Sequence, residues 1–246
     1  MSDYPETEEF SDEVQTNPSP PSYGELKSMD PMIGGRRTQW ATSNDSQFQP
    51  VGRSYATLVP DAYTIEEHQG HIYFCRFELN TKNLLKLPGT VLTEVVNEID
   101  KFWDLYEHYK KFKINHKRGI ILGGPAGSGK SCTLKMIADN VIKRGGIVIQ
   151  YTNPQLLLAG IRVFREIQPT TPIVVLMEDL DAILSQSRHG QSEILNILDG
   201  VLSDALDRIV FVATTNFFEE LERRITNRPS RFDRVFVIEN PNAEAR

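Results

Sequence analysis

The sequence has few cysteines and no long apolar run. Cys75 and Cys132 are the only cysteines among 246 residues. At most one disulfide can therefore form, and we expect a reducing, cytoplasmic location. No apolar stretch approaches the roughly 18 residues that span a bilayer, and no basic segment followed by an apolar run opens the chain. We therefore expect a soluble protein that is not secreted and has no membrane partner.

The sequence also lacks an excess of positive charge. It has 33 acidic and 27 basic residues, a formal net charge of −6. Residues 1–30 contain eight of the acidic residues and one base, Lys27, so this segment alone carries −7 and the rest of the chain carries about +1. A nearly neutral body argues against a strongly basic nucleic-acid-binding surface.

The N-terminal third has two compositional segments. Residues 1–50 combine Pro, Ser, Thr, Asn and acidic residues with few aliphatic ones. Such a segment buries too little apolar surface to offset its conformational entropy, which predicts a disordered acidic tail, with a docking segment for a partner as the alternative. Residues 51–88 contain strand-like runs such as 71–79. They predict a small N-terminal β-containing module, either an adaptor or a subdomain packed on the core.

Residues 89–246 have the pattern of an α/β domain. Between 89 and 113, apolar residues recur every three or four positions, which predicts an amphipathic helix. From Arg118 on, apolar runs alternate with segments long enough for helical crossovers between parallel strands. The predicted strands are 119–123, 146–151, 172–178, 209–215 and 235–238, and the predicted helices are 130–143, 154–166, 192–203 and 219–225.

A glycine-rich loop follows the first of these strands and precedes the first helix. It satisfies the P-loop pattern G-x-x-x-x-G-K-[ST], in which backbone N–H groups surround phosphates and the next helix directs its positive end at them. Lys130 is predicted to neutralise the β- and γ-phosphates of ATP, and Ser131 to bind Mg²⁺. The predicted nucleotide-binding residues are Gly124, Pro125, Ala126, Gly127, Ser128, Gly129, Lys130, Ser131 and Cys132.

A second apolar strand, predicted over 172–178, ends in two carboxylates, Glu178 and Asp179. In a P-loop sheet, such a strand places one acid near Mg²⁺ and a neighbouring acid where it can orient or deprotonate water.

With these two elements the sequence resembles the AAA+ ATPases, and in particular their AAA subfamily. Asn216, in Ala213-Thr214-Thr215-Asn216, looks like the sensor-1 residue that holds the attacking water. The stretch 228–234 is similar to the subfamily's second region of homology, whose arginines reach a neighbour's γ-phosphate; the matching residues are Arg228 and Arg231. The resemblance implies a three-layer P-loop NTPase fold with a five-stranded parallel sheet in the order 5-1-4-3-2, ATP and Mg²⁺ as cofactors, and a ring, expected to be a hexamer.

The sequence departs from the subfamily's pattern in three places. Its acidic pair is inverted to Glu178-Asp179, as in relatives of the mitochondrial AAA protein that translocates a Rieske iron–sulfur subunit, so by position Glu178 takes the Mg²⁺ role and Asp179 activates water. Residues 156–160, Leu-Leu-Leu-Ala-Gly, replace the aromatic pore loop; they are either an apolar gripping loop or the buried face of a helix. The chain ends at Arg246, where the family begins its helical lid, so we expect residues 89–246 to be a core without the lid. Either the sequence is a fragment, or another polypeptide supplies the lid, or the protein works without one. The general impression is of a phage- or virus-like member, in a host cytoplasm.

The leading hypothesis is thus an Mg²⁺-dependent ATPase ring that remodels or translocates a protein substrate, which the sequence does not name. A nucleotide-gated scaffold with little hydrolysis is a second hypothesis, motivated by the inverted pair and the missing lid. A DNA-remodelling ATPase is a third, and the near-neutral body disfavours it.

Overall fold

The computed structural model describes residues 39–42, 48–51, 54–79, 91–185, 188–199, 204–217 and 231–239. Most of the predicted tail, the predicted helix 219–225 and Arg228 lie outside these residues. The chain divides into two units, residues 1–59 and 60–246. None of the helices in the described ranges is long and apolar enough to cross a bilayer.

The first unit contains one described hairpin. Strands β1 (Gln39–Thr42) and β2 (Phe48–Val51) pair antiparallel, with Gln39 opposite Val51. These strands fall almost entirely within the stretch predicted to be disordered. Their aromatic and β-branched residues, such as Trp40 and Val51, favour extended structure, a local signal that the overall composition of residues 1–50 hides.

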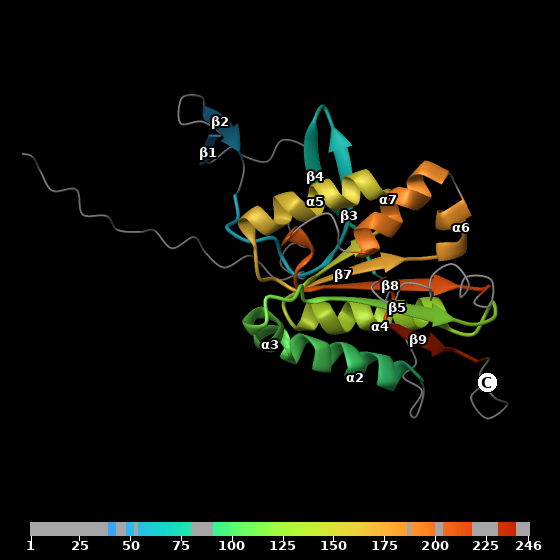
Figure 1. Ribbon diagram of the computed structural model, residues 1–246. Coiled ribbons are helices and arrows are strands. Elements are labelled where there is room, and N and C mark those ends of the chain that lie inside the picture. The colour runs from blue at the N-terminus through green and yellow to red at the C-terminus, as the bar shows by residue number, and fades with distance from the viewer. Residues whose placement is uncertain are drawn as a thin grey trace, which may run out of the picture. The chain divides into compact units, whose positions relative to one another are not determined.

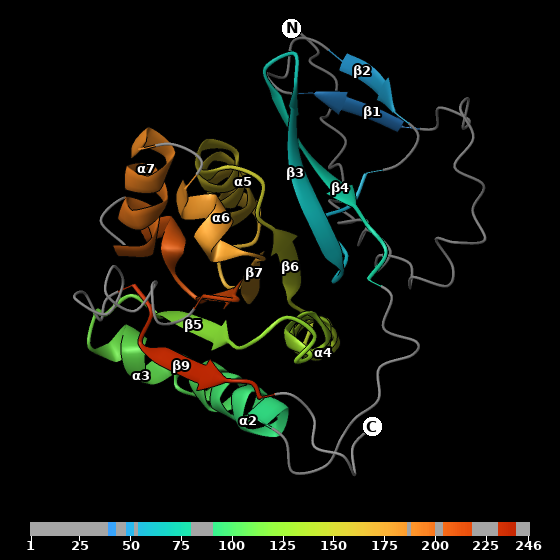
Figure 2. The same cartoon turned by 90° about the vertical axis from the view of Figure 1, so that its right-hand side faces the viewer.

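The second unit is a three-layer α/β structure built on a seven-stranded sheet in the order β4-β3-β6-β7-β8-β5-β9 (Figure 1). Helices α2, α3 and α4 cover one face, and α5, α6 and α7 cover the other (Figures 1 and 2). The strands are β3 (Ala62–His68), β4 (His71–Arg76), β5 (Lys117–Gly123), β6 (Ile147–Gln150), β7 (Ile173–Met177), β8 (Ile209–Thr215) and β9 (Arg234–Val237). The helices are α2 (Val91–Asp104), α3 (Tyr106–Lys111), α4 (Lys130–Lys143), α5 (Pro154–Ile167), α6 (Leu180–Ser185), α7 (Arg188–Asp199) and the 3₁₀ turn η1 (Asp204–Leu206).

The predicted five-stranded sheet is too small, because β3 and β4 extend it beyond β6. Strand β3 pairs in parallel with β6, with Ala62 opposite Val148, and β4 folds back antiparallel on β3. The strand order of the whole sheet differs for the same reason. The strands β9-β5-β8-β7-β6 form a parallel block inside it, in the succession that the family resemblance implies. The hairpin from residues 51–88 is therefore continuous with the core sheet.

Helix α5 covers the β3 extension and contains the stretch 156–160. Its N-terminus is capped by Asn153, whose side chain accepts a hydrogen bond from the Leu156 N–H at 2.8 Å. A Cβ on Gly160 would lie 2.4 Å from Cδ1 of Ile65, so the glycine permits close packing of α5 on β3. Leu157 and Gly160 are buried. Of the two readings of this stretch, the structure favours the buried helix face.

The amphipathic segment predicted as one helix over 89–113 is broken into α2 and α3. The break follows from the carbonyl of Phe102, which accepts hydrogen bonds from the Leu105 N–H at 3.2 Å and from His116 Nε2 at 2.6 Å. His116 is fully buried and stacks on the Phe102 ring at 3.7 Å between centroids. Desolvation lowers the pKa of His116, so the ring is neutral and Nε2–H is the donor.

Arg165 in α5 binds backbone carbonyls at the edge of the sheet where β7 and β8 begin. Its guanidinium donates to five backbone carbonyls, those of Ala205, Gln168, Thr171, Asp207 and Arg208, at 2.6–3.4 Å. Desolvation lowers its pKa to about 10, so it remains charged at neutral pH.

We expect Arg165→Met to lower the free energy of unfolding by about 3 kcal/mol, because it leaves several buried carbonyls without donors. Urea unfolding followed by circular dichroism measures the change. Arg162→Met, at an exposed position of the same helix, is the control and should change the free energy by less than about 0.5 kcal/mol. Equal effects of the two substitutions would contradict a fastening role.

Candidate ATP-binding site

The glycine-rich loop joins β5 to α4 at the edge of the sheet where the parallel strands end. Gly127 and Gly129 have φ of +82° and +97°, a region that side chains disfavour, and Gly129 is the residue from which α4 begins. A Cβ on Gly124 would lie 2.1 Å from the carbonyl oxygen of Ile238, so only glycine lets the loop pass the segment after β9. Residues 125–127 are exposed, which leaves the mouth of the loop open.

Lys130 is held inside this loop. Its Nζ donates to the carbonyls of Gly124 at 2.8 Å and Pro125 at 2.7 Å, and the residue is 8% exposed. Desolvation lowers its pKa, and the charges of Asp179 and Asp181 oppose that shift. The ammonium group therefore stays charged, and among the described residues its hydrogen bonds go to carbonyls of its own loop. An anion in the loop would be its natural partner.

The loop also contains an unpaired polar atom. Ser128 is buried, and its Oγ has no hydrogen-bond partner among the described residues. A buried hydroxyl without a partner costs free energy, and a phosphate oxygen would satisfy it. Together with Lys130 and the exposed N–H groups at the start of α4, it shows that the donors of this loop fit a nucleotide phosphate.

The first acid after β7 faces the start of α4. Ser131 Oγ lies 3.5 Å from Glu178 Oε2, and both residues are exposed. A hydroxyl and one carboxylate suit Mg²⁺, which commonly takes one or two protein ligands together with phosphate oxygens and water. Within the described ranges no group of three or more His, Cys, Asp and Glu side chains is placed to bind a metal by itself, so a metal here would need the phosphates as well.

The second acid faces the end of β8. Asp179 has φ of +50°, its N–H donates to Thr214 Oγ1 at 3.1 Å, and its Oδ1 lies 3.5 Å from Asn216 Nδ2. Asp179 and Asn216, predicted from separate motifs, are thus brought together. Thr214 and Asp181 had no predicted role; Asp181 accepts a hydrogen bond from Thr215 Oγ1 at 2.8 Å. Both residues lie within the two motifs that contain Asp179 and Asn216, and this position was the sequence signal that could have identified them.

Arg231, which was predicted to act on a neighbouring subunit, is paired with a carboxylate of its own chain. It is only 9% exposed and forms two hydrogen bonds with Asp199 at the end of α7, Nε to Oδ1 at 2.9 Å and Nη2 to Oδ2 at 3.0 Å. This pair was not predicted. Cys132, the last residue of the predicted nucleotide-binding set, is half-buried with a free thiol. Arg228 lies outside the described residues.

Comparisons with known proteins agree with this geometry. Residues 120–240 match the family model "ATPase family associated with various cellular activities (AAA)". The chain is 29% identical to a proteasome-activating nucleotidase of Sulfurisphaera tokodaii, over 63% of this chain and 44% of that protein. It is 31% identical to proteasome-activating nucleotidase 1 of Halobacterium salinarum, over 54% and 36%, and 27% identical to human ATPase family gene 2 protein homolog A, over 57% and 17%.

The chain thus spans less than half the length of each of these relatives. The family match covers the glycine-rich loop, both acids and the arginine-rich stretch 228–234. AAA ATPases bind ATP with Mg²⁺, which the donors around Lys130 and Ser131 fit. The fold, the site and the family match agree that residues 120–240 form a P-loop ATPase domain of the AAA type.

Proposed function

We propose that this protein hydrolyses ATP as a subunit of a ring, a hexamer, and uses the turnover to remodel or translocate a protein substrate. The observation that carries the proposal is the convergence of Lys130, the Ser131–Glu178 pair and the Asp179–Asn216 pair at one edge of the sheet. Two relatives are proteasome-activating nucleotidases, which favours a protein substrate over a nucleic acid.

Each side chain has a separate task in this proposal. Lys130 exchanges the carbonyls of Gly124 and Pro125 for phosphate oxygens. Ser131 and Glu178 would hold Mg²⁺, which would supply positive charge to balance that of the ATP phosphates. Asp179 accepts a proton from the attacking water, and Asn216 orients that water.

The arginines complete the site from a neighbouring subunit. Arg228 and Arg231 are proposed to stabilise charge on the neighbour's γ-phosphate, a task that suits guanidinium because it stays charged and binds oxygens bidentately. Arginines supplied in this way contribute about 10³–10⁵ in rate, so hydrolysis depends on assembly. For Arg231, the proposal requires that it exchange its own Asp199 for the phosphate.

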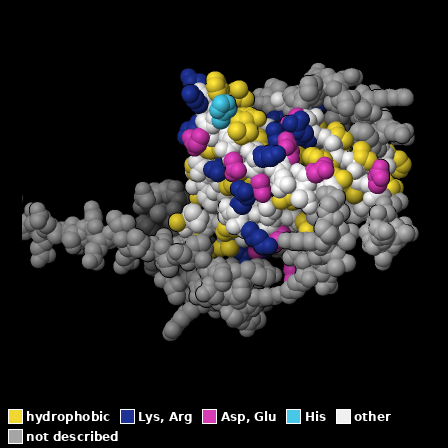
Figure 3. All heavy atoms as spheres, turned by 90° about the horizontal axis from the view of Figure 1, so that it is seen from below, with side chains coloured by type: hydrophobic (Ala, Val, Ile, Leu, Met, Phe, Trp, Pro, Cys, Tyr) yellow, Lys and Arg dark blue, Asp and Glu magenta, His cyan; other side chains and the backbone are white. Residues whose placement is uncertain are grey.

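The pair of Arg231 with Asp199 also gives weight to a second function. A subunit whose arginine stays on its own carboxylate would bind ATP and assemble without rapid hydrolysis, as a nucleotide-gated scaffold. ATP-dependent assembly with no phosphate release above the Lys130→Ala background would favour it. A DNA-remodelling function has less support, because acidic and basic side chains intermingle on the face formed by α2 and α3 (Figure 3).

Mixing two inactive variants tests the ring proposal. Lys130→Ala cannot hold ATP but keeps both arginines, whereas Arg231→Ala keeps its ATP site. We expect each alone to lose at least about 100-fold in ATP turnover, and an equimolar mixture to regain part of it because one subunit supplies the arginine and the other the site. Lys143→Ala, at the exposed end of the same helix α4, is the control and should keep wild-type turnover. Wild-type-like turnover in either inactive variant contradicts the mechanism.

A further inference from the structure

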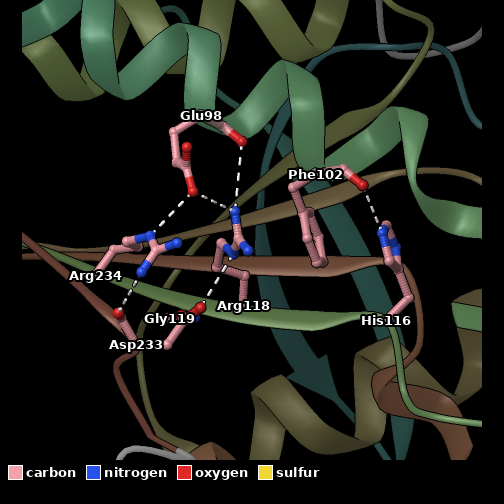
Figure 4. Close-up of polar contacts among 7 residues, drawn as sticks. All are labelled: Glu98, Phe102, His116, Arg118, Gly119, Asp233 and Arg234. Carbon is pink, nitrogen blue, oxygen red and sulfur yellow. Dashed lines mark hydrogen bonds and ion pairs between the residues drawn. The ribbon is translucent and has the colours of Figure 1, made fainter.

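A charged cluster with one largely buried arginine joins α2, β5 and the start of β9, outside the ATP site (Figure 4). At its centre is Arg118 of β5, whose side chain is 10% exposed. Its Nη1 donates to Glu98 Oε1 at 2.9 Å. Its Nε lies 3.1 Å from Asp233 Oδ2, close enough for an ion pair although the N–H is not aligned for a hydrogen bond. One arginine therefore connects helix α2 to the segment that follows Arg231.

Packing fixes the position of this arginine. The guanidinium carbon of Arg118 lies 4.8 Å from the centre of the Phe102 ring, and Phe102 is itself stacked on buried His116. Figure 4 shows the guanidinium between this ring and Glu98. Because an aromatic face lies on one side and carboxylates on two others, the side chain has little freedom to move.

Glu98 also binds a second arginine, Arg234, which belongs to the same segment. Its Oε1 also accepts from Arg234 Nε at 3.0 Å. The hydrogen bond from Arg234 lowers the pKa of Glu98, and the charge of Arg118 adds to this effect. The carboxylate is therefore ionised at neutral pH and bridges two arginines that come from different strands.

The backbone supports the same connection. The Gly119 N–H donates to Asp233 Oδ1 at 3.1 Å, and the Asp233 N–H donates to the Gly119 carbonyl at 3.0 Å. A Cβ on Gly119 would lie 2.0 Å from the carbonyl oxygen of Arg231, so the two segments touch where that glycine stands. Residues 231–233 are thus attached directly to β5, the strand that leads into the glycine-rich loop.

We infer that Glu98, Arg118 and Asp233 form a clamp that positions the arginine-rich segment for the ATP site of the neighbouring subunit. The inference rests on the proposed function, in which that segment acts across a subunit boundary. The three are positioning residues, since they act through the arginines and touch no nucleotide. Stability alone explains them poorly, because ion pairs with partly exposed carboxylates contribute little to the free energy of unfolding. A charge that acts across an interface, by contrast, must be held to within about 1 Å.

A placement experiment separates positioning from general stabilisation. The donor is full-length Lys130→Ala, which offers arginines but no site, and the acceptor is Arg228→Ala/Arg231→Ala, which offers a site but no arginines. Glu98→Ala is added to one partner at a time, and phosphate release by the mixture is measured. On the donor, it should lower turnover at least about ten-fold. On the acceptor, whose arginines are absent, it should leave the turnover of the mixture unchanged within about two-fold.

Asp100→Ala is the matched control. Asp100 lies on the same helix and pairs with Arg144 at 2.9 Å, away from the arginine-rich segment, so its removal should matter little in either partner. Equal losses with Glu98→Ala in donor and acceptor, or no loss in the donor, overturn the clamp. If the unmodified mixture has no activity, the proposed function fails and the clamp with it. If Glu98→Ala does not fold, Glu98→Gln is used in its place. If the double acceptor variant does not fold, Arg228→Ala alone is used as the acceptor.

Discussion

Replacing Asp179 with asparagine is expected to lower ATP turnover by about 10²–10⁴-fold and to leave ATP binding nearly unchanged. Asparagine has the shape of aspartate and tolerates the positive φ of +50° found there, so the backbone and its hydrogen bond to Thr214 should persist. Only the ability to accept a proton is lost. Phosphate release at saturating ATP measures turnover, and titration with a fluorescent ATP analogue measures binding.

Two further substitutions make this result specific. Glu178→Gln should weaken Mg²⁺-dependent binding, because its carboxylate faces Ser131 at 3.5 Å and not Asn216. Asp181→Asn carries the same change of charge two residues after Asp179, and it should have a small effect, since the Asp181 carboxylate accepts a hydrogen bond from Thr215. The opposite pattern would be loss of binding in Asp179→Asn and loss of turnover alone in Glu178→Gln. It would show that the roles follow residue type, with aspartate at Mg²⁺ and glutamate activating water, and not position in the chain.

The parts of the site that depend on local sequence could be predicted from it. The helix Lys130–Lys143 has the predicted bounds, because the glycines of the loop and the first helical residue are fixed by neighbours in the chain. The strands that carry Glu178 and Asn216 were likewise predicted, since a continuous apolar run buried on both faces identifies a central parallel strand. That their ends meet follows from the topology of the parallel sheet.

Contacts between distant residues could not be predicted in the same way. The pairing of β3 with β6 joins residues more than 80 positions apart, and nothing in residues 62–64 shows which strand edge they will meet. Arg231 lies in a recognised motif and Asp199 in a predicted helix, yet their pairing depends on where α7 ends relative to β5. Residue type indicates that an arginine is charged, but only the fold decides which carboxylate it meets.

The pair of Arg231 and Asp199 leads to a prediction about stability. The two side chains are 11% and 7% exposed, so removing Arg231 takes two hydrogen bonds from a largely buried carboxylate. We expect Arg231→Ala to lower the free energy of unfolding by about 3 kcal/mol. Arg234→Ala, whose side chain is 51% exposed, is the control and should cost less than about 1 kcal/mol. Urea unfolding without nucleotide, at a protein concentration too low for assembly, measures both.

The double variant Asp199→Ala/Arg231→Ala decides how a loss of turnover in Arg231→Ala is interpreted. Removal of both buried charges should cost at least about 2 kcal/mol less than the sum of the two single substitutions, because each single substitution already loses the interaction between them. If turnover stays low in the double variant although stability recovers, the missing guanidinium is responsible, as an arginine acting on the neighbouring site requires. If turnover recovers together with stability, Arg231 only anchors the end of α7, and the charge that reaches the neighbour must come from another residue.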